Sequence, residues 1–79
     1  MPTALRVGQF RFFFYAEEGQ EPPHVHIESA EKRAKLWLAP VEETWNDGFR
    51  SGEMKSIERI IVANVDLLLE AWNDFFADE

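Results

Sequence analysis

The stretch Pro22-Pro23-His24-Val25-His26-Ile27-Glu28 decides how the chain folds, because it marks an abrupt entry into an extended segment. Proline fixes φ and keeps the preceding residue out of the helical region, so the chain is extended or turning at Pro22 and Pro23. Pro23 also has no N–H to donate to a sheet, which suits the start of a strand or an edge. From His24 onward, β-branched apolar residues alternate with polar ones. The sequence therefore predicts a strand from His24 to about Glu28.

This alternation places both histidines of the chain on one face of the strand. His24, His26 and Glu28 form a row with a spacing of roughly 7 Å, since side chains two residues apart share a face. Imidazole and carboxylate groups are ligands for zinc, manganese or iron(II), and an imidazole also serves as a general acid or base near neutrality. One flat strand rarely brings three successive side chains of the same face to one ion. Besides a metal site and an acid–base catalyst, a third alternative is that the histidines are structural and hydrogen-bonded to neighbours. We predict no resident metal or other cofactor.

Alternating patterns on either side of this stretch predict further strands. Residues Leu5 to about Tyr15 are aromatic on both faces and are predicted as one long first strand, with a bulge at Gly8. Arg33–Ala39 is the predicted third strand, and Val41–Trp45 is a shorter edge strand. Asn46-Asp47-Gly48 is a strong turn signal, because Asn and Gly tolerate positive φ. The pattern indicates an antiparallel meander of three to four strands.

The C-terminal third has the period of an amphipathic helix. Ser51 is the expected N-cap, and apolar residues then recur at spacings of three and four. The stripe consists of Met54, Ile57, Ile61, Val65, Leu68, Trp72 and Phe75 or Phe76. Its unbroken phase predicts one long helix, with a kink or a break allowed near Asn64. The chain is thus predicted to be a single α+β domain over residues 1–79, with this helix packed on one face of the sheet.

The other face of the predicted sheet has nothing left in the chain to cover it. It collects aromatic side chains, both imidazoles and a lysine, which is the residue mix of an interface or ligand site. The predicted binding surface consists of Phe13, Tyr15, His24, His26, Lys35 and Trp37.

Composition restricts the classes of partner. Eight basic residues stand against fifteen acidic ones, which gives a net charge of −7 and argues against nucleic-acid binding. The chain has no cysteine, so disulfides and thiolate metal sites are excluded. It contains no apolar run of the length of a signal peptide or membrane span. We therefore expect a cytoplasmic protein without a membrane partner.

Several segments of the chain resemble a family of short bacterial proteins, described as domain of unknown function 4160. The resemblance rests on Pro22-Pro23-His24-Val25-His26, Ala34-Lys35-Leu36-Trp37-Leu38, Pro40-Val41, and Ser51 to Phe76 with its Leu69-Glu70-Ala71-Trp72 segment. It covers nearly the whole chain, and the P-P-H-x-H segment is its most specific part. The resemblance names no reaction. It implies a component of a toxin–antitoxin pair, and hence a small protein partner.

Three functional hypotheses follow from the sequence. The preferred one is a non-enzymatic interaction module, whose aromatic and histidine face binds a small protein or a second copy of the chain as a homodimer. The second is a small ribonuclease-like toxin, in which His24 or His26 is the acid or base and Arg33 or Lys35 stabilises phosphate charge. The third is a divalent-metal site on His24, His26 and Glu28. We consider an enzymatic function less favoured than a non-enzymatic one.

Overall fold

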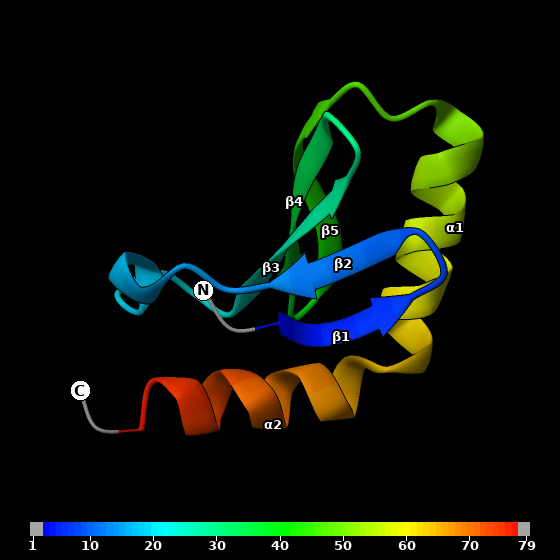
Figure 1. Ribbon diagram of the computed structural model, residues 1–79. Coiled ribbons are helices and arrows are strands. Elements are labelled where there is room, and N and C mark those ends of the chain that lie inside the picture. The colour runs from blue at the N-terminus through cyan, green and yellow to red at the C-terminus, as the bar shows by residue number, and fades with distance from the viewer. Residues whose placement is uncertain (1–2, 78–79) are drawn as a thin grey trace.

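The computed structural model describes residues 3–77, which form an antiparallel five-stranded sheet and two helices (Figure 1). The strands are β1 (Thr3–Val7), β2 (Phe10–Phe13), β3 (His24–Ser29), β4 (Lys32–Leu38) and β5 (Val41–Asp47). They lie side by side in sequence order. A 3-10 turn, η1 (Ala16–Glu18), lies in the connection between β2 and β3, and the helices are α1 (Ser51–Ala63) and α2 (Val65–Phe75). The predicted α+β class and meander are confirmed.

The predicted long first strand is wrong, because it is a hairpin. Gly8 has a φ of +57° and forms the turn between β1 and β2, where Val7 pairs with Phe10. A residue without a Cβ adopts this left-handed conformation at little cost, so the chain reverses at Gly8 and does not merely bulge there. The sheet therefore has five strands, in place of the predicted three to four.

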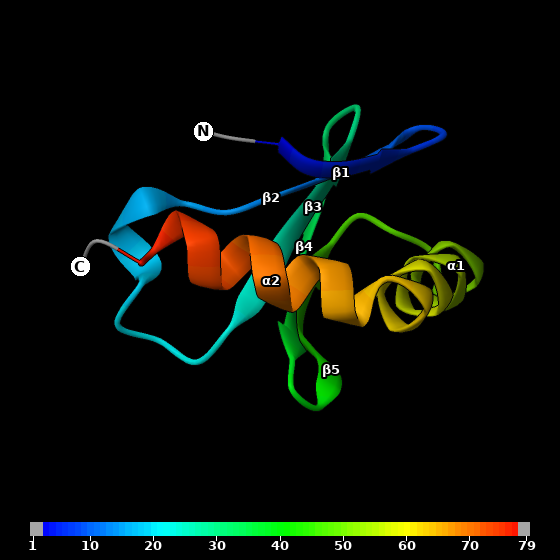
Figure 2. The ribbon, with the colours of Figure 1, turned by 90° about the horizontal axis from the view of Figure 1, so that it is seen from below.

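The single long helix is also wrong, because the chain breaks at Asn64. Asn64 has φ −122° and ψ 19°, and its side-chain Nδ2 donates a hydrogen bond to the carbonyl of Ile60 at 2.8 Å. An asparagine side chain that competes for a helix carbonyl favours a helix end at this position. Figure 2 shows α1 almost end-on while α2 lies across the view, so the two helices run in different directions. Of the two alternatives allowed near Asn64, a kink or a break, the structure has the break.

One hydrophobic core joins the two helices to one face of the sheet. Buried strand residues such as Phe12 and Leu36 pack with buried helix residues such as Ile57 and Leu68, all 0 % exposed. The apolar stripe predicted from the sequence faces this core, although it is divided between α1 and α2. Within the described residues, neither helix is long and apolar enough to cross a membrane.

Substitution of Gly48 tests whether the connection between β5 and α1 requires a left-handed backbone conformation. Its φ is +104°, and a Cβ there would lie 3.0 Å from Cγ of Lys32. We expect Gly48→Ala to lower the free energy of unfolding by about 1–3 kcal/mol, since a left-handed non-glycine residue is strained. Gly52→Ala is the matched control, because Gly52 lies in the first turn of α1 with open space around it. Urea unfolding of both variants measures the difference, and equal effects would contradict the explanation.

Candidate functional site: a glutamate between two buried histidines

Strand register brings the predicted surface residues together. Phe13 pairs with His26, His26 with Lys35, and Lys35 with Trp45, so these four side chains form one row across the sheet. His24 pairs with Trp37 in the next row. Trp45 was absent from the predicted surface.

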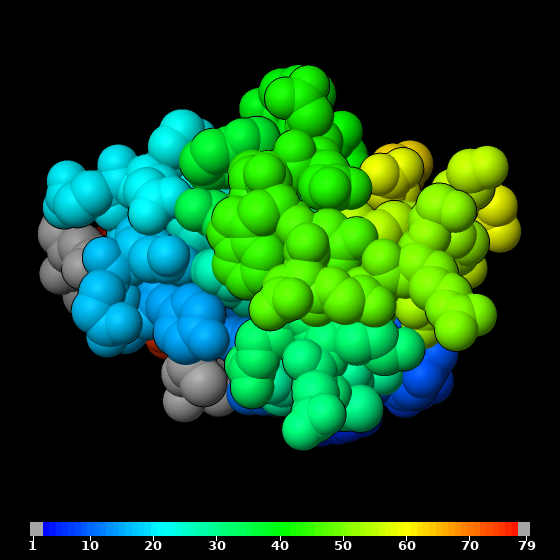
Figure 3. Space-filling view, turned by 90° about the horizontal axis from the view of Figure 1, so that it is seen from above, coloured from blue at the N-terminus to red at the C-terminus, as the bar shows by residue number. Residues whose placement is uncertain are grey.

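The expectation that this face is uncovered is wrong. The connection from Tyr15 to Pro23 folds back over it, because Glu18 reaches both histidines and Glu21 accepts a hydrogen bond from Lys35 at 2.7 Å. Figure 3 shows the light-blue and cyan atoms of this connection beside the green atoms of β4 and β5. Consequently Phe13 is only 1 % exposed, and the two histidines are equally hidden.

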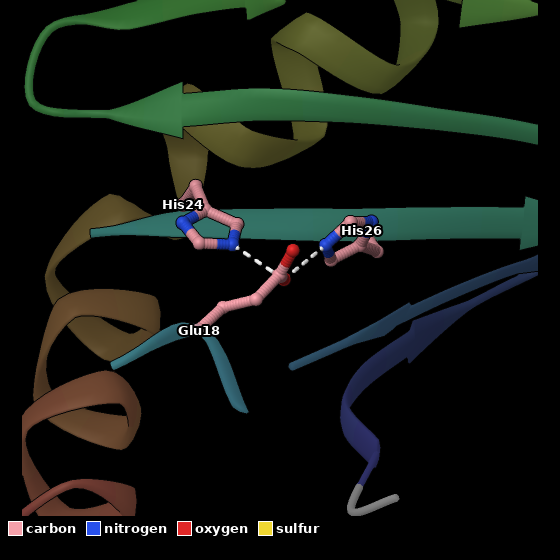
Figure 4. Close-up of side chains that lie close together, drawn as sticks. All are labelled: Glu18, His24 and His26. Carbon is pink, nitrogen blue, oxygen red and sulfur yellow. Dashed lines mark hydrogen bonds and ion pairs between the residues drawn. The ribbon is translucent and has the colours of Figure 1, made fainter. Parts of the chain in front are cut away.

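Glu18 is the residue that covers the histidines. It lies in η1, and its Oε1 is within hydrogen-bond distance of both rings, 2.8 Å from Nε2 of His24 and 2.6 Å from Nε2 of His26 (Figure 4). Both imidazoles project from β3 and are 0 % and 5 % exposed. The Glu18 side chain is 24 % exposed, so it separates the buried imidazoles from solvent. We call these three residues the Glu18–His24–His26 cluster.

A backbone carbonyl fixes the ring of His24. Nδ1 of His24 lies 2.9 Å from the carbonyl oxygen of Pro22. Because a carbonyl oxygen only accepts hydrogen bonds, Nδ1 is the nitrogen that carries a proton. In the neutral imidazole, Nε2 is therefore an acceptor that faces Glu18. The two prolines that start β3 thus also orient its first histidine.

Burial and hydrogen bonding shift the protonation of the cluster in defined directions. Burial lowers the pKa of the His26 imidazole below its ordinary value, although the nearby Glu18 carboxylate acts in the opposite direction. Burial by itself would raise the pKa of Glu18, but its contacts with His24 and His26 hold that pKa below its ordinary value. These directions favour an ionised carboxylate beside a neutral His26.

Aromatic rings surround the cluster. The Tyr15 ring lies 4.6 Å from the His26 ring, and the Trp72 ring of α2 lies 4.9 Å from the His24 ring. The Trp37 and Trp45 rings lie 5.7 Å and 6.0 Å from the two imidazoles. Such a shell excludes water and lowers the local dielectric constant, which strengthens electrostatic interactions inside it.

Glu28 does not join the histidines, although it shares their face of β3. Its Oε1 accepts a hydrogen bond from Arg11 at 2.5 Å, and its Oε2 lies 3.1 Å from Nη1 of Arg33. The row of His24, His26 and Glu28 predicted as a weak metal candidate therefore does not converge. Glu18 takes the place that the sequence pattern gave to Glu28.

Arg33 and Lys35, which were predicted to stabilise phosphate charge, and the neighbouring Lys32 are all engaged with carboxylates. Lys32 Nζ lies 2.7 Å from Glu53, Lys35 Nζ lies 2.7 Å from Glu21, and Arg33 contacts Glu28. A phosphate would have to displace these carboxylates and approach an acidic protein. The geometry gives no support to the ribonuclease-like hypothesis.

Comparison with known proteins identifies the family. A family model described as a domain of unknown function (DUF4160) matches residues 10–73. The match extends from β2 into α2 and includes all three members of the Glu18–His24–His26 cluster. The chain belongs to the DUF4160 family. No curated protein and no solved structure matches it. Membership of DUF4160 assigns no chemistry, so function has to be argued from the site itself.

Proposed function

We propose that the protein is a non-enzymatic interaction module that binds a small basic protein through an aromatic patch at one edge of the sheet. The supporting observation is that Trp45, on the edge strand β5, is 43 % exposed. Tyr15 and Trp37 are half-buried around the same two histidines. We call Tyr15, Trp37 and Trp45 the aromatic patch. Exposed tryptophan and tyrosine are typical of the residues that dominate binding energy in protein interfaces.

This proposal revises the surface predicted from the sequence. Phe13, His24 and His26 are buried beneath the aromatic patch and support it from below. Lys35 is held by Glu21, and its Nζ lies 4.9 Å from the centroid of the Trp37 ring. These four residues therefore position the patch, while its contact area centres on Trp45.

Charge around the patch indicates the chemistry of the partner. Glu42 and Asp47 on β5 are exposed on the same face as Trp45, and Glu42 pairs with Trp37 across the strands. Glu17, in the connection that covers the histidines, is exposed as well. An aromatic centre with an acidic rim is complementary to a basic surface that carries apolar groups.

The edge position adds a second mode of contact. Within the described sheet, β5 pairs with β4 on one side, so its other side presents backbone groups to an added strand. A partner strand placed there would lie directly beside Trp45. A role in a toxin–antitoxin pair, which the family resemblance implies, is compatible with such a small basic partner.

Replacing Trp45 tests this proposal. The wild-type protein is co-expressed with the product of the adjacent gene, and the affinity of the purified pair is measured by calorimetry. We expect Trp45→Ala to weaken binding at least about 30-fold, the effect of losing a residue worth about 2 kcal/mol.

Leu67→Ala is the matched control, because Leu67 is 49 % exposed on α2 and lies outside the aromatic patch. We expect this variant to bind as the wild type does. The proposal fails if the neighbour-encoded protein does not bind, or if the two substitutions weaken binding equally. Sedimentation of the isolated chain separates a hetero-complex from a homodimer, which Trp45→Ala would dissociate if β5 formed its interface.

A further inference from the structure

The Glu18–His24–His26 cluster contains two facing hydrogen-bond acceptors. Pro22 holds the proton of His24 on Nδ1, so Nε2 of the neutral ring presents a lone pair to Oε1 of Glu18 at 2.8 Å. An ionised carboxylate also presents only lone pairs. Two acceptors at this distance repel each other unless a proton or a metal cation lies between them.

Two kinds of positive charge satisfy this geometry. One is a second proton on His24, which would place an imidazolium on a residue that is 0 % exposed. The other is a metal cation bound by the lone pairs of the same atoms. A metal uses the neutral imidazole and the ionised carboxylate, the forms that ligand chemistry requires.

We infer that Glu18, His24 and His26 bind a divalent transition metal of the zinc class, through Oε1 of the glutamate and Nε2 of each histidine. Their ligand atoms all lie within 4.8 Å of one another. Two imidazoles and one carboxylate suit zinc, cobalt or iron(II), whereas magnesium and calcium prefer oxygen ligands alone. The inference goes beyond the proposed function, because the ligands lie beneath the aromatic patch and the partner contacts the patch itself.

The two glutamate–histidine distances are compatible with a small adjustment on metal binding. The two histidine nitrogens lie within 4.8 Å of each other and would approach to about 3.3 Å around tetrahedral zinc. Tetrahedral zinc with bonds of about 2.0–2.1 Å separates its ligand atoms by about 3.3 Å. The glutamate oxygen lies 2.8 Å and 2.6 Å from the two nitrogens, so it has to withdraw by less than about 1 Å. Every residue from 16 to 22 is exposed or half-buried, so this segment can shift without disturbing the core.

The surroundings of the ligands have the features of metal centres. The Pro22 carbonyl accepts from the non-ligating nitrogen of His24, which is the usual way that a protein orients a metal-binding imidazole. Two ligands are almost fully buried, and Glu18 is the one with substantial exposure. Three protein ligands would leave a tetrahedral ion one position for water.

Metal titration of the chelator-treated protein, with any affinity tag removed, tests the inference. We expect calorimetry with zinc chloride to give one bound ion per chain. Glu18→Gln should bind zinc at least about 100-fold more weakly, since loss of residues that merely orient ligands already costs 10–100-fold. Glu17→Gln is the matched control, because Glu17 is the exposed neighbouring carboxylate in η1, and it should bind zinc as the wild type does.

Nitrogen NMR of the imidazoles provides a readout that does not depend on a variant. On zinc addition, Nε2 of both histidines should shift to the value of a metal ligand, while Nδ1 of His24 stays protonated. The inference is overturned if zinc, cobalt and iron(II) all fail to bind, if Glu18→Gln binds zinc as tightly as the wild type, or if the Nε2 signals do not move. Partner affinity of Trp45→Ala is a separate measurement, so either proposal can fail alone.

Discussion

Replacing Trp72 with alanine is expected to lower the free energy of unfolding by about 3–5 kcal/mol. Trp72 is 5 % exposed and anchors α2 to the rest of the protein. Its ring lies 5.4 Å from the ring of Phe14, 4.9 Å from that of His24 and 4.2 Å from that of Phe76. Small domains are stable by only about 5–15 kcal/mol, so this loss would remove much of the total. Urea unfolding followed by circular dichroism measures it.

Two further substitutions show whether packing is the cause. Leu67→Ala removes a side chain that is 49 % exposed on the same helix, and we expect a change within about 0.5 kcal/mol. Trp72→Phe keeps an aromatic ring in the position and should recover part of the loss. A Trp72→Ala effect no larger than that of Leu67→Ala would show that α2 is not anchored through this residue.

The large features of the fold could be predicted from local patterns. Alternation after Pro23 located β3, and the helical period located the C-terminal apolar stripe, because both patterns reflect which side chains are buried. The errors in the predicted secondary structure lie at Gly8 and Asn64. Each of these residues is compatible with two local conformations. A glycine in an alternating run permits a bulge or a hairpin turn, and an asparagine in a helical run permits continuation or a break. Tertiary packing decides between them.

The candidate site could be predicted only in part. The two histidines were identified from their spacing on one strand, but the third member was assigned to Glu28 on the same strand. Glu18 is six positions before His24, in a connection whose path depends on the whole domain. The available signal was the acidic run Glu17-Glu18 so close before Pro22-Pro23-His24. Sequence periodicity describes one element at a time, whereas this site joins two.

Zinc is expected to raise the midpoint of thermal unfolding by about 10–20 °C when its free concentration is 100 times the dissociation constant. A ligand at that excess stabilises the folded state by about 2.7 kcal/mol, provided that it does not bind the unfolded chain. For a domain of 60–100 residues, each kcal/mol raises the midpoint by roughly 4–8 °C. Calorimetric scans of the chelator-treated protein, with and without zinc, measure this increase. Magnesium at the same concentration should leave the midpoint unchanged, because it binds imidazole poorly.

Glu18→Gln should lose most of the zinc-dependent stabilisation, whereas Glu17→Gln should keep it. Hydrogen exchange then shows where the effect originates. Residues 16 to 22 have no fully buried side chain, and polar groups such as Glu18 and Glu21 attach them to the sheet. Their amides are therefore expected to open locally in the metal-free protein and to gain more protection with zinc than the amides of α1. A metal that joins Glu18 to β3 should protect the segment that carries Glu18 more than it protects α1. An equal gain of protection in α1 and in residues 16 to 22 would therefore contradict binding through Glu18.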